Sequence, residues 1–173
     1  MGSTSRIALG QEQSVTRLGL AADVATAVVT NIFTVAGTVR LVSIFGRVVA
    51  QKQANAQLIQ LQHIPTAGGV AADLCAVSAT TSGDDIDTYY MITGNIGDAM
   101  IVAPAALGVS NHMVNAAGLV GAPQGLLLAP GIITMETTVA TDNIGLIDWT
   151  CLFKRIAATG GGLPASTDGI TVL

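Results

Sequence analysis

The residues with the best chemistry for catalysis or metal binding are few and widely spaced in this chain. The histidines are His63 and His112, and the cysteines are Cys75 and Cys151. No C-x-x-C or H-x-x-x-H spacing brings two of them together as metal ligands. Ser110 lies close to His112, but no G-x-S-x-G elbow presents it as a nucleophile. The sequence therefore predicts no catalytic residues, no cofactor and no metal centre.

The densest group of acids is the run Asp84-Asp85-Ile86-Asp87. A calcium loop of the EF-hand type needs Gly at its sixth position and Glu at its twelfth, and this run has neither. The pattern favours a solvated acidic loop, with binding of a hard cation as the alternative. Cys75 and Cys151 both lie in apolar, strand-like runs, which favours two buried thiols. A single bridge between them is the alternative.

Charge is distributed unevenly along the chain. Residues 53–153 contain no Lys or Arg and eight acids, so the net charges are +3 for residues 1–52, −8 for 53–153 and +1 for 154–173. Only 10% of the residues are charged, against about 25% in ordinary soluble domains. Such a chain is expected to cover part of its surface in an assembly, with its basic end meeting an acidic partner or another copy. The scattered basic residues argue against nucleic acid.

Apolar residues alternate with a period of two, and the runs are separated by Gly, Pro and Asn. Eight or so short strands with almost no helical periodicity predict an all-β fold, an antiparallel β-sandwich of the jelly-roll-like kind. The most apolar window, Ala117–Met135, is interrupted by prolines and glycines, which fits turns better than a membrane span. The predicted strands are Thr26–Val35, Val39–Val49, Gln57–Ile64, Ala71–Ala79, Thr88–Thr93, Met100–Val102, Gly125–Ala129, Ile132–Val139 and Leu146–Ala157.

The clearest strand is Leu146–Ala157. Its predicted core face holds Ile147, Trp149, Cys151 and Phe153. In the first strand, strict alternation places Ile32 on one face and Phe33 on the other.

The predicted organisation is one sandwich domain, residues 21–158, with an extended N-terminal arm at 1–20 and a C-terminal tail at 159–173. Gly160-Gly161-Gly162 is typical of a hinge. Beyond it, Ile170–Leu173 resembles a strand, which either adds to the sheet of a neighbouring copy or pairs within its own sheet.

Four runs resemble small structural proteins of tailed-bacteriophage particles, in which several members are capsid decoration (cement) proteins. They are Phe33–Leu41, Gln57–Leu61, Pro65–Cys75 and the closing Gly145–Arg155. The resemblance covers approximately Val24 to Ile156. It implies a structural part of the virion with no catalytic residues.

We therefore expect a virion protein, made in the host cytoplasm and placed on the capsid exterior. Its expected partners are the major capsid protein and copies of itself, with a homotrimer favoured and a dimer as the alternative. The predicted interface residues are Arg6, Arg17, Ile170, Val172 and Leu173. One rival function is a head-fibre or tail-associated module that binds host glycans, which the scarcity of aromatics disfavours. A small enzyme is the other rival.

Overall fold

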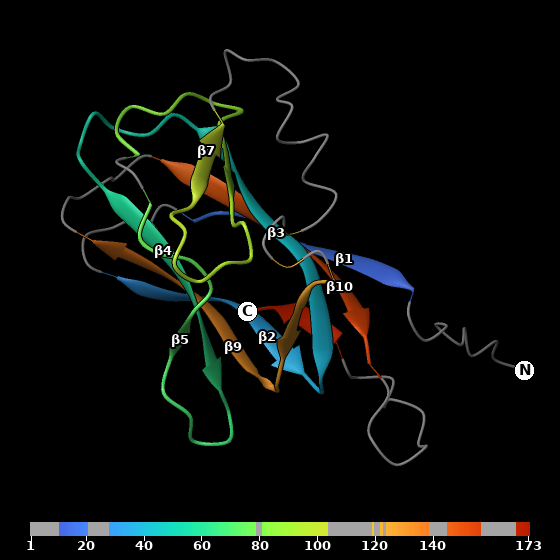
Figure 1. Ribbon diagram of the computed structural model, residues 1–173. Coiled ribbons are helices and arrows are strands. Elements are labelled where there is room, and N and C mark those ends of the chain that lie inside the picture. Colours follow the sequence, from blue (N-terminus) through green and yellow to red (C-terminus); the bar gives the residue numbers. More distant parts are fainter. Residues whose placement is uncertain are drawn as a thin grey trace, which may run out of the picture.

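The computed structural model contains strands and no helix in the part of the chain that it describes. The strands form two antiparallel sheets packed face to face, visible as two layers in Figure 1. The described residues are 11–20, 28–78, 81–103, 119, 122, 124–138, 145–156 and 169–173.

We name each sheet after a long inner strand. The β3 sheet has the order β1-β10-β3-β6-β7, and β8 also pairs with β3. Its strands are β1 (Glu12–Arg17), β3 (Val39–Ala50), β6 (Tyr89–Met91), β7 (Ile101–Ala103), β8 (Leu126–Leu128) and β10 (Leu146–Arg155). The β9 sheet has the order β11-β2-β9-β4-β5. Its strands are β2 (Val29–Ala36), β4 (Leu58–Pro65), β5 (Ala72–Asp73), β9 (Gly131–Thr138) and β11 (Gly169–Val172).

The pairing pattern is that of a jelly roll. β1 pairs with β10, β2 with β9, β3 with β6 and β4 with β5, so the early strands pair with progressively nearer late ones. Pairing of β10 with β3 and of β9 with β4 then joins these ribbons into the two sheets. This arrangement confirms the predicted all-β sandwich of jelly-roll type.

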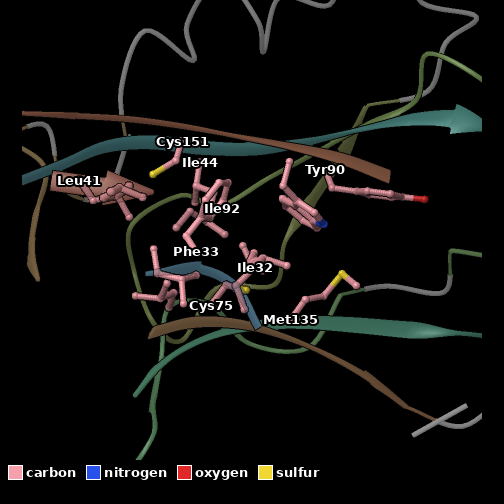
Figure 2. Packing of buried hydrophobic residues seen from close by; sticks show 14 of the residues in the cluster. Ile32, Phe33, Leu41, Ile44, Cys75, Tyr90, Ile92, Met135 and Cys151 are labelled. Carbon is pink, nitrogen blue, oxygen red and sulfur yellow. The ribbon is translucent and has the colours of Figure 1, made fainter. Parts of the chain in front are cut away.

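The core lies between the two sheets and is built from alternate residues of each strand. In β10 the side chains of Ile147, Trp149, Cys151 and Phe153 are all buried, which confirms the core face predicted for this strand. Figure 2 shows side chains from both sheets meeting in this layer.

The prediction of strict alternation along β2 is wrong at the centre of this strand. The register with β9 shifts between Asn31 and Phe33, as at a β-bulge. Because of this irregularity, Ile32 and Phe33 are both fully buried instead of facing opposite sides. Val29 and Asn31 before it are exposed.

The described strands nearest the two ends of the chain are part of the sandwich. Within the predicted arm, β1 forms the edge of the β3 sheet along its whole length beside β10. In the predicted tail, β11 pairs with β2 of the same chain, which is the own-sheet alternative. The predicted hinge, Gly160-Gly161-Gly162, lies outside the described residues.

The predicted strand Ala71–Ala79 is reduced to β5. Beyond Asp73, side chains replace part of the ladder that would continue the strand along β4. The amide of Gln60 donates to the Cys75 carbonyl at 3.0 Å, and the Ser78 hydroxyl accepts from the Ile59 N–H at 2.9 Å. The backbone of this segment therefore stays attached to β4 without a regular ladder.

Candidate interaction surface

The acidic loop at 84–87 is tied to the rest of the protein. Each of its three carboxylates accepts a hydrogen bond from a different donor. The donors are the Tyr90 hydroxyl to Asp84 at 2.5 Å, the Gln51 amide to Asp85 at 2.7 Å and the Arg47 guanidinium to Asp87 at 2.7 Å. No three His, Cys, Asp or Glu side chains in the described ranges lie close enough together to hold one ion. The loop is thus anchored by three separate contacts.

A buried polar cluster lies beneath this loop. Lys52 is 2% exposed, and its ammonium donates to the Gln57 side chain at 2.7 Å. Thr81, also buried, donates through its hydroxyl to the Gln57 carbonyl at 3.0 Å. Sequence reasoning counted Lys52 with the basic end of the chain, but the structure places its charge inside, where it donates to Gln57 of the same connection between β3 and β4.

The two cysteines come from opposite sheets and are both buried and free. Cys151 lies in β10 of the β3 sheet, whereas Cys75 follows β5 of the β9 sheet (Figure 2). Burial raises the pKa of the Cys75 thiol to about 11 and also raises the pKa of Cys151. Both are therefore protonated, unreactive core residues at neutral pH.

His63 is also buried, and its ring contacts the backbone. Its ring Nε2 lies 3.1 Å from the Ala129 carbonyl oxygen, and burial lowers its pKa. Ser110 and His112, the other candidates for catalytic chemistry, lie outside the described residues.

The outer face of the β9 sheet has almost no charge. Its strands contain no Lys or Arg, and their only acids are Glu136 and, at the edge, Asp73. Alternation and register place the following side chains outward: Val29, Asn31, Thr34, Leu58, Gln60, Gln62, Ile64, Ile132, Glu136 and Thr138. We call this set the uncharged face. Its polar groups are mainly amides and hydroxyls.

The strands of the β3 sheet hold nearly all the described basic residues. These are Arg17, Arg40, Arg47, Lys154 and Arg155, against the acids Glu12 and Asp148. The uneven charge of the sequence therefore becomes a difference between the two sheets.

Two of these cations are direct neighbours on the β3 sheet. Lys154 of β10 lies opposite Arg40 of β3, with Glu12 on one side and Leu127 on the other. We call these four residues the basic row. Like charges placed opposite each other destabilise a sheet, and within the described residues neither cation makes an ion pair. Leu127 is 66% exposed, so an aliphatic side chain stands beside the two charges.

The predicted interface residues differ in how far they are exposed. Val172 and Leu173 are exposed, by 44% and 54%. Arg17 and Ile170 are buried within their own chain, so neither is presented on the surface. Arg6 lies outside the described residues. Sequence reasoning missed the basic row, because only the pairing of β3 with β10 brings Arg40 and Lys154 together.

Comparisons with known proteins found no match among family models, curated proteins or solved structures. No helix long and apolar enough to cross a membrane occurs in the described part of the chain. The fold and its two unlike surfaces define this protein as an all-β jelly-roll module.

Proposed function

We propose that this chain is a structural virion protein of the capsid decoration type, which oligomerises and binds the outer surface of a phage head. The observation that carries the proposal is the contrast between the two sheets. One presents the uncharged face, and the other presents the unpaired basic row. Jelly rolls are frequent in viral capsid proteins, which supports the proposal by analogy of fold.

The uncharged face suits contact between copies. Burying an ionised side chain is costly unless it is paired, whereas neutral amides and hydroxyls cost less to bury once they are hydrogen-bonded. Glu136 is the one ionised group in the middle of this face. Burial of this charge-poor sheet surface therefore costs little, which supports a closed oligomer.

The basic row suits contact with the shell. Arg40 and Lys154 gain a favourable interaction from any acidic surface that approaches them, and Leu127 adds apolar area beside them. Electrostatic attraction of this kind sets association rate and specificity. Many copies on a symmetric head then add their weak contacts by avidity.

The test is light scattering on the purified chain, followed by mixing with heads stripped of it. We expect a trimer or dimer that rebinds the heads and raises their resistance to heat. A stable monomer that ignores the heads contradicts the proposal.

Substitutions in each surface test the two contacts separately. Thr34→Arg places a charge on the uncharged face, and Ser14→Arg places the same charge at an exposed position of β1 as its control. We expect only the first to dissociate the oligomer. Replacing Arg40 and Lys154 by Gln is expected to leave the oligomer intact and to weaken head binding at least tenfold. If neither surface responds, the proposal is wrong.

A further inference from the structure

The aromatic residues of this chain are sharply divided between core and surface. The chain has six, and four of them are core residues. These four are Phe33, Tyr90, Trp149 and Phe153, each no more than 3% exposed. The remaining two, Phe45 and Tyr89, are half-buried and adjacent, with ring centroids 6.4 Å apart and planes at 50°.

Both of these rings stand on the outer face of the β3 sheet. Their neighbours Ile44, Val48 and Tyr90 in the same strands point into the core. Tyr89 lies opposite Arg47 in the register of β6 with β3, so the guanidinium stands beside the ring pair on the same face.

Arg47 is held by the carboxylate of Asp87, a residue whose backbone has an uncommon conformation. Its Nε and Nη2 both contact the same oxygen of Asp87, Oδ1, at 2.7 and 2.6 Å. Asp87 is the only described residue other than glycine with a positive φ, 70°. Such residues occur more often at functional sites than elsewhere. The backbone N–H of Asp87 donates to the Val48 carbonyl at 2.8 Å, which holds the residue against β3.

The pair remains open to solvent. The Arg47 and Asp87 side chains are 47% and 53% exposed. An ion pair this exposed contributes little to stability. With Oδ1 engaged twice, Oδ2 of Asp87 is left as an acceptor, and the guanidinium keeps further N–H donors.

We propose that Phe45, Arg47, Asp87 and Tyr89 form a binding site for a neutral saccharide. The negative face of an aromatic ring attracts the C–H groups on one side of a pyranose. A pair of neighbouring hydroxyls then donates to Oδ2 of Asp87 and accepts from Arg47, in charge-assisted hydrogen bonds. The site is distinct from the basic row, because Arg40 and Arg47 are seven residues apart in one strand, or about 23 Å.

The experiment is saturation-transfer NMR on the intact chain with glucose, galactose, mannose and N-acetylglucosamine. We expect transfer to at least one sugar, strongest at the protons of one ring face. Asp87→Asn tolerates the left-handed backbone and removes the charge, and we expect it to weaken binding about tenfold, as for the loss of one charge-assisted hydrogen bond. Tyr89→Phe keeps the ring and is expected to keep binding.

The matched control is the same substitution at two points of β3. Arg47→Gln is expected to abolish saccharide binding and to leave head binding unchanged, whereas Arg40→Gln is expected to weaken head binding and to leave saccharide binding unchanged. The inference and the proposed function therefore fail separately. No transfer to any of the four sugars overturns the saccharide site, and so does binding that Asp87→Asn and Arg47→Gln leave unchanged.

Discussion

At the scale of single residues, the Trp149 indole packs closely against β3 at Gly46. A Cβ added at Gly46 would lie 2.8 Å from Ile147 Cγ2 and 3.0 Å from the indole ring. We expect Gly46→Ala to lower the free energy of unfolding by about 1–3 kcal/mol, the usual cost of overpacking. Urea unfolding measures this. Gly97→Ala is the control, because a Cβ there meets nothing within 4 Å; equal effects at both positions would contradict the argument.

His63 gives the fold a pH dependence on the acidic side of neutrality. Burial lowers its folded pKa below the ordinary value of 6.5, so the folded state disfavours the charged ring. The stability is therefore complete above pH 6.5 and is lost as the pH falls below that value toward the folded pKa. We expect unfolding midpoints in urea to drop between pH 7.5 and 5.5, and His63→Gln to flatten that drop. An unchanged drop in the variant would assign it to other groups.

At the scale of elements, β11 shows how the chain uses its C-terminal segment. Ile170 is 4% exposed and belongs to the core, whereas Val172 of the same strand is 44% exposed. We expect Ile170→Ala to cost about 2–4 kcal/mol and Val172→Ala less than about 1 kcal/mol. Denaturant unfolding of both variants at one protein concentration checks both values. Equal costs at the two positions would contradict the placement of Ile170 in the core of its own chain.

At the scale of the whole molecule, the jelly roll makes folding a long-range process. The outermost pair joins β1 to β10, and one of its contacts, between the Thr16 and Thr150 hydroxyls, spans 134 positions. Contacts so distant in sequence slow the search for the native pairing. We expect refolding in milliseconds to seconds, followed by the fluorescence of the buried Trp149 in stopped flow. Refolding in microseconds would contradict this expectation.

The surfaces of the whole molecule follow from the same topology. Strands far apart in the chain carry its basic residues, and the jelly roll places them in one sheet. Because the strands without Lys or Arg gather in the other sheet, the two sides of the module differ in charge.

The sequence by itself determined the class of fold and most of the core. Alternation along β10 is enough to predict that Ile147 to Phe153 bury every second side chain, since a strand turns successive residues to opposite faces. The tertiary structure decided the burial of side chains that alternation does not predict. The irregular register of β2 turns Ile32 and Phe33 inward together, and the charged side chain of Lys52 is buried beside Gln57.

The candidate sites could be recognised almost only from the tertiary structure. Arg40 and Lys154 become neighbours only when β3 pairs with β10, and Phe45, Arg47 and Tyr89 share a face only when β3 pairs with β6. A sequence states which side chains exist and how often they repeat. The register between distant strands decides which of these side chains meet. It is set by the sum of many weak contacts across the whole fold, which a single stretch of sequence does not contain.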